Sequence, residues 1–510
     1  MNVTRKELLA GGLAVFSMMA TKALAGAVIA GDADALAGLP SRADLWKWVE
    51  RLNGFGPRLT GSPAHARAID FLAGELRAMG LDVRRDHLNM RRWTPRSAGF
   101  VLSDGTVIDV AAPYPYSGRT PAEGLSGEMV SFDGRVRSFR QARGKIAVVT
   151  VKRRDLTATL LKIATNRRSH LPDDVDFPRS VTTPLITGLL GVPIEKARKH
   201  GVLGVVCVFE GVSAEQLAGQ VLPFTTPYRD IPAIWVTEEQ GARIKAAIAD
   251  GLHGRLVLDA TLEEVPSDTL YAVLPGRNSA ETIIVNTHTD GPNACEENGG
   301  AGVLALARYF SRLPLSARNR TLVFVLVTGH FQLPQFGRDG NQATATWLAM
   351  HPELWDGKDG HAKAVAGVTI EHLGCMEWRD DLTKGRPAPT GQLELDLIFT
   401  GNQAVNDVYV AAARGRTKIR ALTVAPLAAQ AMLGEGQPLY ASGIPTISSC
   451  PIPDYLCQIL PDGGMDRLDQ DYAHQQVDTF ARAVAMLDRM PQHEIGTIPF
   501  KLTTAIGKLL

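Results

Sequence analysis

The sequence has almost no net charge, few aromatic residues and no low-complexity tract. Its 54 Lys and Arg residues are balanced by 53 Asp and Glu residues, and aromatic side chains make up 6% of the 510 residues. A chain without excess positive charge lacks the field that attracts nucleic acid or an anionic membrane. We therefore expect no nucleic-acid partner and instead a small molecule or peptide. The 45% hydrophobic and 21% charged composition is typical of a globular protein.

Cysteine is scarce as well, with five residues in the chain. An oxidising compartment would permit disulfides, and the short separation of Cys450 and Cys457 favours a local pair there. Buried free thiols are the alternative. The odd count leaves at least one thiol unpaired within a monomer.

No apolar run near the N-terminus reaches the roughly 20 residues that a membrane-spanning helix needs. The run from Leu8 to Ala20 follows basic Arg5 and Lys6 and precedes the small-residue triplet ending at Ala25. This pattern predicts a signal peptide over residues 1–25, cleaved after Ala25, with a membrane anchor as the alternative. The mature protein is then periplasmic or secreted, with no stable membrane span.

The length of the chain predicts two or more domains, because single hydrophobic cores stop growing well below this size. Residues 26–43 read as a flexible segment. Helical periodicity surrounds a Gly- and Pro-rich loop at 53–63, whereas short apolar strands dominate 100–262. We expect one α/β domain built from 44–99 and 263–510, interrupted by a β-rich insert at 100–262.

The α/β domain is expected to contain a mainly parallel central sheet flanked by helices. Apolar runs at 282–286, 321–328 and 365–370 alternate with helical stretches at 301–313 and 341–350. Unbroken β-branched runs of this kind suit strands that are buried on both faces.

Polar side chains follow each of these three strands. His288 and Asp290 follow the first, His330 the second, and Glu371 the third, while Glu296 and Glu297 lie shortly after the first. Ligands of open α/β sheets bind beyond the carboxyl ends of the strands, and zinc takes imidazole and carboxylate ligands. A metal site is therefore predicted at this edge. Any one of these residues alone would more often be a solvated loop residue.

Residues 53–63, with Phe-Gly-Pro-Arg-Leu-Thr-Gly-Ser at their centre, resemble the start of the co-catalytic di-zinc aminopeptidase-like family. That family includes secreted aminopeptidases, carboxypeptidase Q-like enzymes and glutaminyl cyclases. Segments around Gly144-Lys145-Ile146, Gly201–Val205 and Ile231-Pro232-Ala233 look like the protease-associated domain inserted in many members. The resemblance extends from about 44 to 489.

The resemblance implies one conserved metal set. His288 matches the first metal histidine and Asp290 the carboxylate that orients it, while Glu297 and Glu371 fall on two aspartate ligands. The second zinc set is incomplete. The family's Glu-Glu pair corresponds to His330-Phe331 or Gly329-His330, residues 458–462 lack the final histidine, and His474 comes too late.

The leading hypothesis is an exported metallohydrolase that cleaves a peptide or related amide with one zinc ion. His288, Glu297 and Glu371 would hold the ion, with His330 or Glu296 taking the proton and Asp290 orienting His288. Two alternatives stay open. One is a non-catalytic binding protein, and the other is an acyl-transfer or cyclising enzyme such as the glutaminyl cyclases of the same family.

Overall fold

The computed structural model describes residues 35–134, 136–157, 167–173, 180–182, 192–223, 227–331, 342–426 and 432–498. The predicted signal peptide lies outside these residues. Within the segment predicted to be flexible, a short 3-10 helix covers Ala35–Gly38 and helix α2 begins at Arg42. No helix in the described part is long and apolar enough to cross a membrane.

The larger lobe is built on a mixed sheet whose centre is parallel, as the sequence predicted. Strands β13, β12, β14 and β19 lie side by side in this order and run parallel, and antiparallel neighbours extend both sides. The strands of this lobe, in sheet order, are β11 (His253–Leu274), β13 (Arg320–Val327), β12 (Asn278–His288), β14 (Lys363–Thr369), β19 (Thr446–Ser449), β17 (Asp396–Thr400), β18 (Ala421–Val424) and β7 (Arg167–Leu171).

Helices cover both faces of this sheet because the central strands are apolar on both sides. In β13, Leu322, Phe324 and Leu326 join one hydrophobic cluster, whereas Val323, Val325 and Val327 join another. The first cluster contains residues of α2 (Arg42–Asn53), α3 (Pro63–Ala78), α9 (Gly299–Arg312), α11 (Gln403–Ala412) and α13 (Gln470–Arg489). The second contains residues of α10 (Ala343–Met350) and α12 (Gly436–Ala441).

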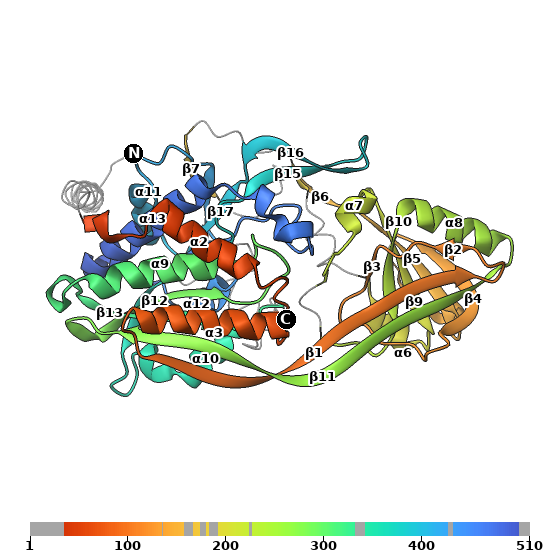
Figure 1. The fold of residues 1–510 in the computed structure, drawn as a ribbon, viewed down its shortest axis with the longest axis horizontal. Coiled ribbons are helices and arrows are strands. Elements are labelled where there is room, and N and C mark those ends of the chain that lie inside the picture. The colour runs from red at the N-terminus through yellow and green to blue at the C-terminus, as the bar shows by residue number, and fades with distance from the viewer. Residues whose placement is uncertain are drawn as a thin grey trace, which may run out of the picture.

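A long two-stranded ribbon joins this lobe to a smaller one (Figure 1). Its strands are β1 (Val83–Leu102) and β11, which pair antiparallel from Val83 opposite Ala272 to Leu102 opposite Gly254. The sequence analysis did not predict a ribbon of this length. Both boundaries expected for the insert, at 99/100 and 262/263, fall inside this ribbon.

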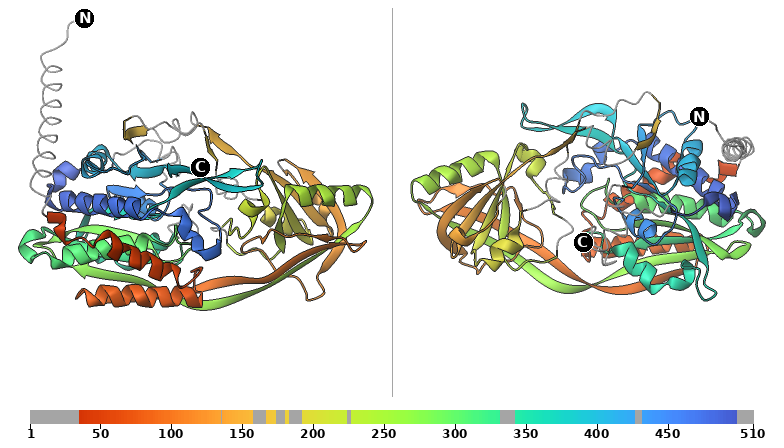
Figure 2. Two further views of the ribbon diagram at one scale, coloured as in Figure 1. Left: turned by 45° about the horizontal axis from the view of Figure 1, so that its top comes forward. Right: turned by 180° about the vertical axis from the view of Figure 1, so that it is seen from behind.

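The strands of the smaller lobe continue the same sheet through the start of β11, and they have their own hydrophobic clusters on both faces. The sheet order is β3 (Ala112–Pro113), β10 (Ala233–Thr237), β9 (Gly204–Glu210), β5 (Ile146–Lys152) and β4 (Leu125–Asp133). Helix α6 (Ile194–Lys199) leads into β9, and α8 (Glu238–Ala249) packs beside β9. The lobe lies at the far end of the ribbon (Figure 2).

The smaller lobe also touches the larger one directly through α7 (Ala214–Leu217) and the residues after it. The backbone N–H of Val221 donates to the carbonyl of Cys457 at 2.9 Å, and Gln458 donates to the carbonyl of Glu215 at 2.7 Å. The Tyr116 hydroxyl donates to the carbonyl of Phe331 at 2.5 Å. The inserted segment is therefore anchored beside the residues that follow β13.

Candidate metal centre

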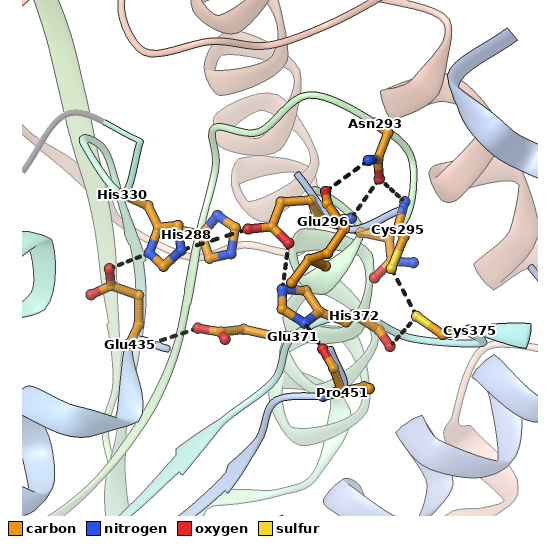
Figure 3. Close-up of polar contacts among 12 residues, drawn as sticks. His288, Asn293, Cys295, Glu296, His330, Glu371, His372, Cys375, Glu435 and Pro451 are labelled. Atoms are coloured by element: carbon orange, nitrogen blue, oxygen red, sulfur yellow. Dashed lines mark hydrogen bonds and ion pairs between the residues drawn. The ribbon is translucent and has the colours of Figure 1, made fainter. Parts of the chain in front are cut away.

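The three predicted strand ends converge in the structure. Strands β13, β12 and β14 are parallel neighbours, so their carboxyl ends meet at one edge. His288 is the last residue of β12, and His330 and Glu371 follow β13 and β14. Glu296, in the loop between β12 and α9, and His372 complete a cluster of five side chains (Figure 3). All five are buried, with at most 3% of each residue exposed.

Each histidine is fixed by a partner at its Nδ1 atom. His288 Nδ1 donates to the backbone carbonyl of Asp290 at 2.8 Å, and His372 Nδ1 donates to that of Pro451 at 2.7 Å. His330 Nδ1 lies 2.7 Å from a carboxylate oxygen of Glu435. Partners of this kind set the tautomer of metal-binding histidines, and they leave Nε2 for the ligand.

The Nε2 atoms face carboxylates within the cluster (Figure 3). His372 Nε2 lies 2.7 Å from Glu296 Oε2, and His330 Nε2 lies 3.6 Å from Glu296 Oε1. Two sets of three residues each bring their ligand atoms within 4.8 Å of one another. The sets are His288, Glu296 and His330, and His288, Glu371 and His372.

The unpaired atoms of the cluster fit a cation. Among the described residues, His288 Nε2 and Glu371 Oε2 are buried without a hydrogen-bond partner, whereas His372 Nε2 and Glu296 Oε2 have only each other, 2.7 Å apart. Buried polar atoms are normally satisfied, and leaving several unsatisfied together is costly. Imidazole nitrogens and carboxylate oxygens are the donor set of zinc sites, so an ion would satisfy these atoms.

The orientations of the histidine rings indicate which of the two sets can share one ion. The rings of His288 and His330 are stacked, with centroids 3.9 Å apart and planes 10° from parallel, whereas those of His288 and His372 meet at 72°. The lone pair of an imidazole nitrogen lies in the plane of its ring. One ion cannot lie in two parallel stacked planes, but it can lie where two inclined planes intersect. The set with Glu371 and His372 therefore matches a shared ion, and His330 lies beside it.

The charge balance of the cluster also suits a cation. Burial lowers the pKa of His288 well below its usual value, with His330 and His372 adding to the decrease. Burial would also lower the pKa of His330, but the hydrogen bond and charge of Glu435 outweigh it and raise that pKa to about 9. Burial raises the pKa of Glu371 to about 7. Without an ion, protonated groups balance the carboxylates.

Glu297, predicted as a metal ligand, lies outside both sets. Its carboxylate pairs with Arg58 at 2.6 Å in a fully buried ion pair, and it also accepts from the backbone N–H of Arg58 at 2.9 Å. Its neighbour Glu296, predicted to take a proton, points into the cluster instead. The Asn293 side chain accepts from the backbone N–H groups of Cys295 and Glu296, and this turn orients Glu296.

Asp290, predicted to orient His288, does so through its backbone carbonyl. Its carboxylate accepts from the hydroxyl of Thr60 at 2.5 Å and from the backbone N–H groups of His330 and Phe331 at 3.2 and 2.9 Å. The carboxylate therefore positions the segment that carries His330. Arg58 and Thr60 both belong to the loop at 53–63. Through them the loop fixes the carboxylates of Glu297 and Asp290.

Two residues of the site, His372 and Glu435, were not predicted from the sequence. His372 follows Glu371 directly, but only its left-handed backbone, with φ of 54°, brings both side chains to the same cluster. Glu435 precedes α12 and is 105 residues from His330. Besides binding His330, it accepts from the backbone N–H of Thr344 at 2.9 Å, and its own N–H donates to Glu371 at 2.8 Å. The only sequence signal for His372 was its place at a predicted strand end.

The residues near the expected second zinc set have other partners. Phe331 is buried and packs in the main hydrophobic cluster. Gln458 bonds to the smaller lobe, and His474 lies on α13, where its Nε2 is 3.1 Å from the carbonyl of Pro40. All five cysteines are buried, and the structure shows no bond between Cys450 and Cys457, the pair that the sequence favoured. Burial raises the pKa of Cys450 to about 12, with His372 opposing the increase.

No family model matches the sequence, and no curated protein matches it. Solved structures do share its fold. A zinc aminopeptidase from Bacillus subtilis aligns with a TM-score of 0.62 and 15% identity over 90% of this chain and 100% of its own. A peptidase M28 precursor from Shewanella amazonensis aligns with a TM-score of 0.59 and 18% identity, covering 95% and 99% of the two chains.

An aminopeptidase from Aneurinibacillus sp. strain AM-1 gives a TM-score of 0.58 at 15% identity over 89% of this chain and 95% of its own. The chain therefore has the zinc-aminopeptidase-like fold that the sequence resemblance implied. At these identities the likeness concerns the fold, and the chemistry must come from the site itself.

Proposed function

We propose that this protein is an exported metal-dependent hydrolase that cleaves a peptide or a related amide with a single zinc ion. The main support is the convergence of three buried ligand atoms, His288 Nε2, Glu371 Oε2 and His372 Nε2. The first two lack a hydrogen-bond partner among the described residues, and the third faces only the carboxylate of Glu296. The aminopeptidase-like fold supports a peptide as the substrate class.

One ion agrees better with the donor atoms than two. Both candidate sets need His288, whose Nδ1 atom already donates to the Asp290 carbonyl, so only Nε2 is left for one ion. His288, Glu371 and His372 would hold it, with Glu296 facing His372. A zinc ion in such a site polarises a substrate carbonyl and lowers the pKa of water at the reaction centre.

His330 is the residue best placed to transfer a proton. Its Nδ1 is held by Glu435, and its Nε2 faces Glu296 at 3.6 Å, next to His288. A carboxylate behind an imidazole orients the ring and stabilises its protonated form, as in other acid–base pairs. Burial of the whole cluster strengthens these interactions by excluding water.

Metal analysis and hydrolysis assays test the proposal together. We expect about one zinc ion per chain in the purified mature protein, and hydrolysis of some members of a panel of aminoacyl and peptidyl anilides. His372→Ala should lose both zinc and activity, whereas the matched control His474→Ala should keep both. Absence of bound metal after zinc supplementation would overturn the proposal.

A protein that binds zinc but hydrolyses no substrate in the panel would instead fit the binding-protein alternative. Cyclisation of N-terminal glutamine peptides would identify the acyl-transfer alternative. Export is tested separately by mass spectrometry of the secreted or periplasmic form, for which we expect an N-terminus at Gly26 or a near neighbour. The smaller lobe is proposed to be a protease-associated domain that positions the substrate beside the site.

A further inference from the structure

Two cysteines that the proposed chemistry does not use meet beside the metal cluster. The sulfur atoms of Cys295 and Cys375 are 2.8 Å apart, although the residues are separated by 80 positions in the sequence. Both residues are buried, with 1% and 0% exposed. The sulfur atoms are within about 1 Å of the covalent S–S distance of about 2.04 Å.

These cysteines belong to the two segments that carry site residues (Figure 3). Cys295 directly precedes Glu296, and the Cys375 thiol donates to the backbone carbonyl of His372 at 3.0 Å. Asn298 and Leu373 already join the two segments through a reciprocal pair of hydrogen bonds of 2.8 and 2.7 Å. The contact between the thiols therefore lies in a region whose backbone is fixed on both sides.

We infer that Cys295 and Cys375 form a disulfide, which cross-links the loop bearing Glu296 to the turn bearing Glu371 and His372. Two S–H bonds break and one S–S bond forms. The two electrons and two protons pass to a low-molecular-weight disulfide or a disulfide-exchange protein, whose own disulfide is reduced to two thiols. Oxidation takes place while these segments are still open, because both sulfur atoms are inaccessible in the folded chain.

The cross-link limits the separation of Glu296 and His372. Glu296 and His372 lie 2.7 Å apart across the same two segments. A covalent bond between Cys295, which adjoins Glu296, and Cys375, which lies three positions after His372, limits how far these two side chains can separate. The inference does not depend on the metal or on hydrolysis, so its failure would leave the proposed function unaffected.

Peptide mapping after refolding tests the inference. The full mature chain is refolded in a buffer of oxidised and reduced glutathione, denatured with an alkylating reagent and digested with trypsin. Cleavage isolates Cys295 in peptide 278–308 and Cys375 in peptide 364–379, while Cys450 and Cys457 share peptide 421–467. We expect 278–308 linked to 364–379, and three of the five cysteines alkylated.

Two variants test whether the link involves Cys295 and not Cys457. Cys457→Ser should retain the link, and Cys295→Ser should lose it without creating another. Alkylation of all five cysteines in the wild-type chain, or a link confined to peptide 421–467, would overturn the inference. These outcomes are read from denatured protein and therefore do not require that each variant be active.

Discussion

The rings of His288 and His330 lie face to face, with centroids 3.9 Å apart, although the two residues come from the ends of different strands. Because one ion cannot lie in both ring planes, His330 is expected to act on protons while His288 binds the metal. We predict that His330→Gln keeps its zinc but lowers kcat by about 10²-fold or more, which is typical of a lost general acid or base. Metal analysis and steady-state kinetics on the same sample check this.

His372→Ala provides the opposite pattern, in which zinc and activity are lost together. If His330→Gln loses zinc to the same extent as His372→Ala, then His330 is a ligand and the set that contains Glu296 is the correct one. The two variants therefore decide between the two sets of residues.

The buried ion pair of Arg58 and Glu297 predicts a structural role for a residue that sequence analysis placed on the metal. Removing one partner of a buried pair leaves the other charge uncompensated and typically costs about 3–5 kcal/mol. We expect Arg58→Met to lower the free energy of unfolding by about 3–5 kcal/mol. The double variant Arg58→Met/Glu297→Leu should recover part of this loss. Urea denaturation measures both.

Two controls accompany this prediction. Arg42→Met breaks the exposed pair with Asp471 and should leave the urea midpoint nearly unchanged. Glu297→Gln should retain zinc, whereas Glu371→Gln should not. Equal loss of zinc from these two variants would restore Glu297 as a metal ligand and contradict the assignment made from the structure.

Most of the fold and the edge that carries the site could be predicted from sequence periodicity. The buried runs of β12, β13 and β14 are local features, and parallel neighbours necessarily bring their ends together. The choice between Glu296 and Glu297 was not predictable, because adjacent loop residues point in different directions. Their orientations depend on Asn293 nearby and on Arg58, which is 239 residues from Glu297 in the sequence.

Contacts between distant parts of the chain also explain why Glu435 and the β1–β11 ribbon were not predicted. The role of Glu435 rests on contacts with His330 and Glu371 across 105 and 64 positions. The full length of the β1 and β11 ribbon depends on pairing between segments far apart in the chain. No pattern within either strand indicates the position of its partner, which is why the ribbon was not predicted from the sequence.

The surroundings of His65 predict that stability falls as the pH is lowered. His65 Nδ1 accepts from the backbone N–H of Gly61 at 3.1 Å, so its other nitrogen carries the proton and donates to Thr289 at 2.7 Å. Protonation of Nδ1 would place two hydrogens against each other. Burial lowers the pKa of His65 from 6.5 to about 4, with Asp290 and Asp268 opposing the shift and Arg58 adding to it.

Because the folded-state pKa of His65 is the lower one, the stabilisation is complete above pH 6.5 and is lost as the pH falls from 6.5 towards 4. The loss can reach about 3 kcal/mol, from about 1.4 kcal/mol per pKa unit. We expect the stability difference between wild type and His65→Gln to shrink by this order between pH 7 and pH 4.5 in urea titrations. Parallel pH profiles for the two proteins would contradict this assignment.

Gly434 lies directly behind the metal cluster and should not tolerate a side chain. Its φ is +70°, and a Cβ atom there would collide with the carboxylate of Glu371. Gly443, just beyond α12, is a matched control, because its φ is +85° but no atom lies within 4 Å of a Cβ placed there.

Gly443→Ala should cost about 1–2 kcal/mol of stability from backbone strain alone and leave zinc affinity unchanged. Gly434→Ala should show the same strain and, because Glu371 must move, also weaken zinc binding by about 10-fold or more. Competition with a chelating dye measures both affinities, and equal affinities in the two variants would show that Glu371 does not hold the ion.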